Sequence, residues 1–173
     1  MHAKKLLIAT LLAFALPAVA ADKTAEVHTV SASGIGEKIG TVTFADSDQG
    51  LVITPDLHQL APGAHGFHIH QKPSCDVATK DGKQTAAGAA GGHYDPAAKG
   101  KHAGPHGMGH RGDLPVLMVN DDGNASQQML APRLKLADVE GRAIMIHEGG
   151  DNYSDAPKPL GGGGGRIACG VID

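Results

Sequence analysis

Short segments of alternating apolar and polar residues dominate this chain of 173 residues. Successive side chains of a β-strand point to opposite faces, so this pattern predicts strands with one buried face. Glycine, asparagine and aspartate separate the segments, and no stretch has the spacing of a helix longer than a turn. The eight predicted strands cover residues 27–32, 39–44, 51–54, 65–70, 114–119, 126–130, 143–147 and 167–171. We therefore expect an all-β fold, an eight-stranded Greek-key β-sandwich or flattened barrel.

Two long segments, residues 71–112 and 148–166, interrupt the strand pattern. Long loops in a compact domain are usually functional or disordered. The first has little apolar content, so a metal site or a disulfide is expected to hold it in place. The second ends in the glycine run 161–165, which we interpret as backbone that passes close to a site rather than as a flexible linker.

The N-terminus is typical of a secretory signal peptide. Lys4 and Lys5 precede an apolar run over residues 6–16, and Ala18-Val19-Ala20 supplies small residues for cleavage. The run is too short to span a bilayer. We expect residues 1–20 to be removed on export and residues 21–173 to form a single domain.

The charge of the chain argues against a nucleic-acid partner. Because the leader holds two lysines and no acidic residue, its removal lowers the formal net charge from −3 to −5. No membrane partner is expected either. Whether the chain is a monomer or a homodimer stays open.

Cys75 and Cys169 are the two cysteines of the chain. An even pair in an exported protein is interpreted as a disulfide, and closing a loop of about 100 residues contributes about 4 to 5 kcal/mol of stability. Two free buried thiols remain the alternative.

Six histidines and one aspartate form a set with the spacing of metal ligands. His68 and His70 lie on one face of a predicted strand, and His147 ends another strand. The other members are His93, His102, His110 and Asp113. Imidazoles suit borderline transition metals, and seven donors are too many for one tetrahedral ion. If one histidine serves both ions, each ion has four ligands.

The two groups have different chemistry. Three imidazoles and one carboxylate from a glycine-rich loop make a closed set that suits structural zinc. The other group has nitrogen ligands alone and suits copper with an open position. His106 competes with His110, because it also has ligand spacing from His102, but the Gly109-His110 sequence with Asp113 three residues later favours His110.

At these residues the chain resembles the copper–zinc superoxide dismutases in their bacterial periplasmic form. The matching stretches span the expected mature chain and are residues 66–70, 91–96, 100–102, 109–115, 147–152 and 162–172.

The resemblance implies one copper and one zinc ion per chain, a small anionic substrate, superoxide, and a periplasmic location. It implies that copper cycles between Cu(II) and Cu(I) while two superoxide anions and two protons become dioxygen and hydrogen peroxide. The implied copper ligands are His68, His70, His93 and His147, and the implied zinc ligands are His93, His102, His110 and Asp113. His93 would bridge the ions and transfer a proton.

The resemblance also implies roles for four further residues. Arg166 would guide the anion, Asp151 would hydrogen-bond ligands of both metals, and Cys75 and Cys169 would form the disulfide. A plain surface charge for Arg166 and an ordinary turn role for Asp151 are the alternatives. A copper carrier or metal buffer on the same fold is the competing function, although it needs neither a bridging histidine nor an anion-guiding cation. A zinc hydrolase is a more distant possibility.

Overall fold

The computed structural model describes residues 21–80 and 82–173, so the predicted signal peptide lies outside the described residues. No helix in this part of the chain is long and apolar enough to cross a membrane. The strands and helices, in chain order, are β1 (Lys23–Ser31), β2 (Gly34–Ser47), β3 (Gly50–Leu57), β4 (Gly63–His65), β5 (Phe67–His70), β6 (Ala78–Lys80), β7 (Lys83–Thr85), the 3-10 helix η1 (Gly88–Ala90), β8 (Leu117–Val119), β9 (Met129–Ala131), α1 (Leu136–Val139), β10 (Ala143–His147), the 3-10 helix η2 (Leu160–Gly162) and β11 (Arg166–Val171).

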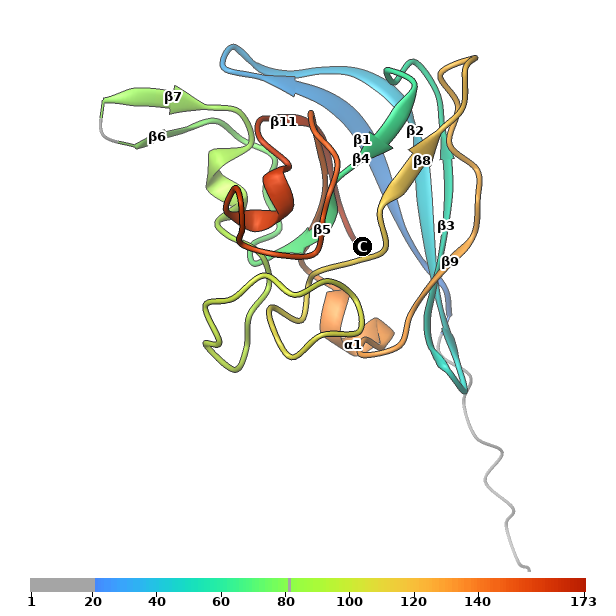
Figure 1. The fold of residues 1–173 in the computed structure, drawn as a ribbon. Helices are drawn as coiled ribbons and strands as arrows, with labels where there is room; N and C mark the ends of the chain where they lie inside the picture. Colours follow the sequence, from blue (N-terminus) through green and yellow to red (C-terminus); the bar gives the residue numbers. More distant parts are fainter. Residues whose placement is uncertain (1–20, 81) are drawn as a thin grey trace, which may run out of the picture.

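Seven of the strands form one antiparallel sheet in the order β5-β10-β11-β1-β2-β3-β9. Figure 1 shows this sheet curled into a half-barrel, with β4 and β8 as a separate two-stranded ribbon beside it. The predicted all-β fold is confirmed, and its main part is a curled antiparallel sheet.

The main core fills the concave side of the sheet. Its large side chains include Phe44, Phe67, Ile69, Ile144 and Ile146, all with no solvent exposure. Side chains alternate along β5 and β10, so the residues between Phe67 and Ile69 and between Ile144 and Ile146 point to the opposite face. That opposite face carries His68 and His70.

The strand boundaries differ from the predicted ones. Gly66 divides the predicted strand 65–70 into β4 and β5. Its N–H donates to the Gly149 carbonyl (2.7 Å) and its carbonyl accepts from the His147 N–H (2.9 Å). The predicted loop 71–112 contains the hairpin β6–β7, which has polar residues and no alternating pattern. The described residues therefore form eleven strands, of 3 to 14 residues, where eight were predicted.

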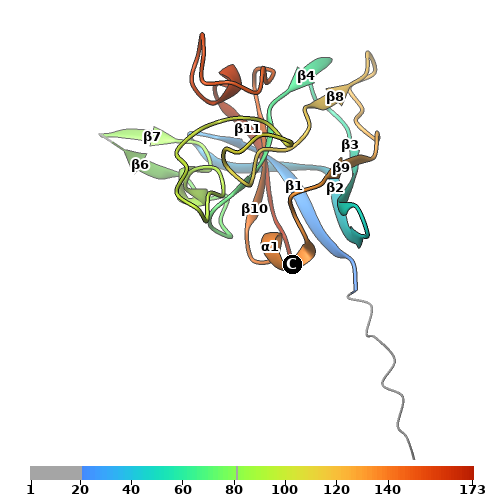
Figure 2. The same cartoon turned by 60° about the horizontal axis from the view of Figure 1, so that its bottom comes forward.

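Both long loops lie on the outer side of β5, β10 and β11, and Figures 1 and 2 show them away from β2 and β3. Under the first loop sits a second, smaller apolar cluster, which includes Ala87, Ala90 and Met145. Within it, Cys75 and Cys169 form the predicted disulfide, with their Cα atoms 5.7 Å apart. The bridge ties the first loop to β11.

Candidate metal centre

Two neighbouring strands supply the first three histidines. His68 and His70 point to the same side of β5, because residues two apart on a strand share a face. Met145 of β10 pairs with His68 in register, and His147 lies two residues further on, where β10 ends. All three imidazoles thus reach the outer face of the sheet, beneath the long loops.

The first long loop pairs with the free edge of β5 and brings the remaining ligand candidates beside it. The backbone of His93 forms an isolated antiparallel β-bridge with His70, and that of Asp113 forms one with His68. The Ile69 N–H donates to the Gly112 carbonyl (2.9 Å), and the Ile69 carbonyl accepts from the Tyr94 N–H (2.8 Å). Ladder hydrogen bonds at one strand residue therefore position two distant parts of the loop.

The seven side chains form two groups that share one residue. Donor atoms of His68, His70, His93 and His147 lie within 4.8 Å of one another. Donor atoms of the second group meet the same limit, and its members are His93, His102, His110 and Asp113. All seven residues are buried, with at most 8% of their surface exposed. The structure thus gathers the same two groups of side chains that the sequence spacing predicts.

The second group converges on a single carboxylate oxygen. The Nδ1 atoms of His93, His102 and His110 lie 3.0, 3.1 and 3.4 Å from Asp113 Oδ1. Three nitrogens and one oxygen that face a common point match the donor set of a closed tetrahedral zinc site.

Ring nitrogens without partners mark where ions would bind. Six buried imidazole nitrogens have no hydrogen-bond partner among the described residues: His68 Nδ1, His70 Nε2, His93 Nε2, His102 Nδ1, His110 Nδ1 and His147 Nε2. A buried polar atom without a partner is costly, and metal coordination is one of the few ways to satisfy it. The donor set therefore fits two bound ions.

The opposite ring nitrogens are held by the protein. His70 Nδ1 lies 2.9 Å from the Gly91 carbonyl oxygen, and His147 Nδ1 lies 3.3 Å from that of Gly164. Partners of this kind fix the orientation of a metal-binding imidazole and leave its other nitrogen as a donor.

Asp151 connects the two groups from the second long loop. Its Oδ2 accepts a hydrogen bond from His68 Nε2 (2.7 Å), and its Oδ1 accepts one from His102 Nε2 (2.8 Å). These three residues also lie close enough for an ion of their own. Because both contacts are hydrogen bonds of ideal length, we interpret Asp151 as a link between the groups and not as a third metal site.

Burial keeps the imidazoles of the first group neutral. It lowers the pKa of His68 to about 3 and that of His147 to about 4, and it lowers the pKa of His70 and His93 as well. A neutral imidazole has the lone pair that a metal needs.

His102 behaves differently. Burial opposes its protonation, but its contacts with the Asp113 and Asp151 carboxylates outweigh burial and raise its pKa to about 9. Burial acts to raise the pKa of both carboxyls, yet their histidine partners hold it well below the usual value.

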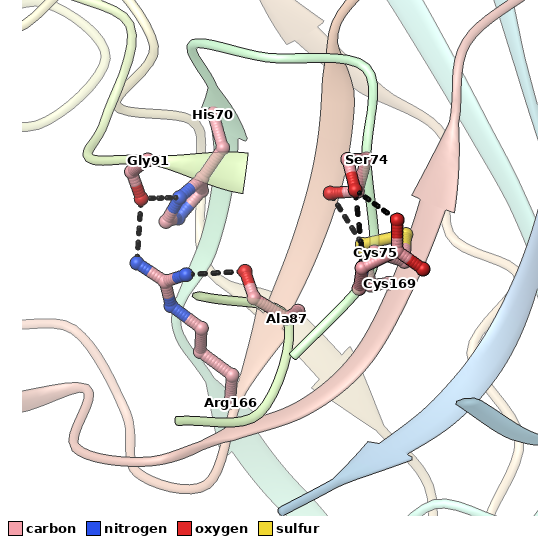
Figure 3. Close-up of a disulfide and its surroundings, with 8 residues drawn as sticks. His70, Ser74, Cys75, Ala87, Gly91, Arg166 and Cys169 are labelled. Carbon is pink, nitrogen blue, oxygen red and sulfur yellow. Dashed lines mark hydrogen bonds between the residues drawn. A yellow bond between two sulfur atoms is a disulfide. The ribbon is translucent and has the colours of Figure 1, made fainter. Parts of the chain in front are cut away.

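Arg166 lies beside the first group, at the start of β11. Figure 3 shows its guanidinium between two backbone carbonyls, with Nη1 donating to Ala87 (2.6 Å) and Nη2 donating to Gly91 (2.6 Å). The Gly91 carbonyl also faces His70 Nδ1. A cavity of about 330 Å³ opens beside the arginine and Gly92. The guanidinium is thus a fixed positive charge at the edge of the histidine cluster.

The glycine run passes close to the site, as interpreted from the sequence. A Cβ atom at Gly163 would lie 3.3 Å from the His147 side chain, and one at Gly161 would collide with the Asp151 carboxylate. Gly161 also has a φ of 70°, which disfavours other residues. The run therefore lets backbone cover His147 and Asp151.

Other histidines stay outside the two groups. His106 is exposed and belongs to neither group, whereas His110 belongs to the second. His65 is buried, with ring nitrogens 2.7 Å from the His147 carbonyl oxygen and 2.8 Å from that of Ala61. Both ring nitrogens are therefore used by backbone carbonyls, and His65 has a structural role.

Two residues near the site carry no signal in the sequence. The Asp155 carboxylate accepts the backbone N–H of His102 (2.9 Å). Arg133 contacts the loop that carries His102 and His110. No motif contains either residue, since both contacts join distant parts of the chain.

Comparisons with known proteins agree on one family. The copper/zinc superoxide dismutase (SODC) family model matches residues 38–172. Cu-Zn superoxide dismutase 2 of Salmonella typhimurium is 59% identical over 168 residues, which are 96% of this chain and 96% of that protein. The Cu/Zn superoxide dismutase structure from Brucella abortus superimposes with a TM-score of 0.86 at 49% identity, covering 88% of this chain and 100% of that one. The solution structure of the monomeric copper, zinc superoxide dismutase from Salmonella enterica gives 0.79 at 56% identity, with the same coverage.

Proposed function

This chain belongs to the copper/zinc superoxide dismutase family, and on that basis we propose that it converts two superoxide anions and two protons into dioxygen and hydrogen peroxide. The observation that carries the proposal is that two buried groups share His93 and that six of their ring nitrogens have no hydrogen-bond partner among the described residues. A carrier of one copper ion needs neither the second group nor the shared residue.

Copper is assigned to His68 Nδ1, His70 Nε2, His93 Nε2 and His147 Nε2. Zinc is assigned to His93 Nδ1, His102 Nδ1, His110 Nδ1 and Asp113 Oδ1. The unpartnered nitrogens support the copper set, and the convergence of three Nδ1 atoms on Asp113 supports the zinc set. Both sets come from one chain, so we expect a monomer to be active.

Copper, when bound, supplies the electron exchange between two superoxide anions, and zinc supplies a fixed charge that orders the loop. Arg166 attracts the anion and orients it, because its guanidinium is held by two carbonyls and its remaining N–H groups are not used by them. His93 would act as the proton donor, because its Nε2 could carry a proton whenever no metal is bound to it and pass that proton to the reduced product. Asp151 keeps His68 and His102 oriented through one carboxylate.

The protein is proposed to act in the periplasm as an antioxidant enzyme. The leader-like residues 1–20, the intramolecular disulfide and the bacterial relatives support an exported protein. Residues 21–173 are proposed to be its single catalytic domain.

Metal analysis and kinetics on the same preparation test the proposal. We expect one copper and one zinc ion per purified chain and rapid consumption of superoxide in a stopped-flow assay. His147→Ala should lose copper, keep zinc and lose activity. A preparation that holds both metals and consumes superoxide no faster than the His147→Ala variant would instead identify a metal-binding protein on this fold.

A further inference from the structure

The Arg133 guanidinium donates hydrogen bonds to four backbone carbonyls of one loop. Its Nε donates to Pro105 (2.9 Å), and Nη1 donates to Gly109 (3.4 Å). Its Nη2 donates to both Gly104 (3.2 Å) and His110 (2.6 Å). All three nitrogens of one side chain are therefore directed at a segment of seven residues, 104–110.

Residues 104–110 have few apolar side chains whose packing could stabilise the conformation of the segment. Its sequence is Gly-Pro-His-Gly-Met-Gly-His, and the two large side chains before His110, His106 and Met108, are exposed. Met108 has 81% of its surface in solvent. Three glycines raise the entropy cost of ordering the loop. Backbone carbonyls are thus the main groups by which the rest of the protein can fix it.

Arg133 lies in a turn that is anchored in the hydrophobic core. The residues on either side of its turn, Ala131 and Leu134, are 2% and 1% exposed, and the Leu134 N–H donates to the Ala131 carbonyl (3.2 Å). A second arginine reinforces the contact from the other side. Arg111 Nε donates to the Arg133 carbonyl (2.8 Å), and Arg111 Nη1 lies 3.1 Å from Asp138 Oδ1.

The hydrogen bonds of Arg133 act on the backbone of a proposed zinc ligand and of its neighbours. The shortest one ends on the carbonyl of His110 itself. The His110 N–H donates to the Lys101 carbonyl (2.8 Å), next to His102, and the Ala103 N–H donates to Asp113 Oδ2 (3.0 Å). The conformation of the segment therefore decides whether the two imidazoles face Asp113 together.

We propose that Arg133 is a positioning residue for the zinc site, which sets zinc affinity by clamping residues 104–110 and never touches the metal. The inference rests on the proposed function, because it assumes that His102 and His110 bind zinc. Lysine cannot replace it, since a single ammonium group cannot reach four carbonyls as the planar guanidinium fork does.

Zinc affinity in Arg133→Lys and Arg133→Ala tests the clamp. Competition with a chromogenic chelator should show zinc bound about 10- to 100-fold more weakly than in the wild type, the usual effect of removing a residue that supports a metal ligand. Zinc release should be correspondingly faster. Copper affinity should change far less, because His68, His70 and His147 lie on strands. Amide exchange should accelerate over residues 101–110.

Two comparisons separate positioning from a general loss of stability. Ile53→Val removes a methylene from the core on β3 and serves as the stability control. If its unfolding free energy is similar to that of the Arg133 variants, it should still bind zinc with wild-type affinity. Methylguanidinium should restore zinc binding to Arg133→Ala, because a cavity of about 290 Å³ lined by Arg111, Met108 and Arg133 gives access to the vacated position.

The outcomes distinguish this inference from the proposed function. Wild-type zinc affinity in both Arg133 variants would overturn the proposed role of Arg133 and leave the proposed function intact. A loss of zinc affinity that the Ile53 variant reproduces would also overturn it. A wild-type protein that binds no zinc would overturn the zinc assignment and the clamp together.

Discussion

Three of the four imidazoles of the proposed copper group are held by different protein partners, so single substitutions should have separable effects. His68 is held by a carboxylate, His70 by the carbonyl that also holds Arg166, and His147 by the glycine run. Removing one ligand therefore leaves the orientation of the others in place. Residue-level experiments can then distinguish a metal ligand from a nearby histidine.

Alanine variants of His110 and His106 test the assignment of the zinc ligand most directly. His110→Ala should weaken zinc binding by orders of magnitude, because it removes one of three Nδ1 atoms that face Asp113. His106→Ala should change zinc binding little, since that side chain is exposed and outside both groups. Zinc titration of both variants checks the assignment, and the reverse order of effects would move the ligand to His106.

Arg166 should control the rate and not the metal content. The chain is acidic overall, so an anion needs a local positive field near His70 and His147. Arg166→Glu should lower the second-order rate with superoxide by about 10-fold or more, whereas Arg166→Lys should lose much less. Stopped-flow rates at several salt concentrations measure this. Salt should slow the wild type more than the Glu variant, because it screens an attraction that the variant lacks.

Two findings would contradict this role. A wild-type rate in Arg166→Glu with both metals bound would show that the arginine does not guide the substrate. Loss of copper from that variant would show that the contacts to Ala87 and Gly91 serve the metal site itself.

At the scale of elements, the sequence predicts where most strands lie, but not all of their ends or their long-range contacts. The alternation over 143–147 predicts β10 to the residue, because its Ile144 and Ile146 fill the core between outward residues. Gly66 breaks an apolar run that looks continuous, and this break depends on backbone bonds to Gly149 and His147. The side chains that the structure gathers into two groups could be predicted from spacing. The clamp by Arg133 could not, since nothing local distinguishes it from a surface arginine.

The disulfide should hold the first long loop at its beginning. Cys75 lies in the small cluster that includes Ala87 and Ala90, and Ala87 and Gly91 are the residues whose carbonyls hold Arg166. Reduction should cost about 2 to 5 kcal/mol of unfolding free energy and speed amide exchange over residues 75–91. The cysteines should not react with thiol reagents before reduction. Superoxide turnover should fall before zinc is lost, because the zinc group has its own contacts at 101–113.

Cys75→Ala/Cys169→Ala serves as a control for the reductant, since it lacks the bridge under all conditions. It should match the reduced wild type in stability and be insensitive to reductant. Unchanged exchange over 75–91 in either sample would show that the apolar cluster alone holds the loop.

At the scale of the whole molecule, the buried centre of the metal-free protein contains histidines whose pKa values are shifted in opposite directions. Burial lowers the pKa of His68 and His147 to about 3 and about 4, below the usual value of 6.5. The unfolded chain then binds more protons than the folded one below pH 6.5, so stability falls as the pH drops from 6.5 toward 4. His102 has the opposite shift, with a pKa raised to about 9 by Asp113 and Asp151 against the effect of burial. Its contribution is complete below pH 6.5 and is lost as the pH rises through 9.

The metal-free protein should therefore be most stable near pH 6.5 and less stable on both sides. Urea unfolding in the presence of a chelator, at intervals from pH 4 to pH 10, measures this profile. His102→Gln should lose the decline above pH 6.5 and keep the one below it, while His106→Ala should retain the wild-type profile because its side chain is exposed. Zinc binding near pH 7.5 should release about one proton, since Nδ1 of the protonated His102 must give up its hydrogen to act as a ligand. Stability that rises steadily from pH 6.5 to pH 9, or zinc uptake without proton release, would show that Asp113 and Asp151 do not hold His102 protonated before the metal arrives.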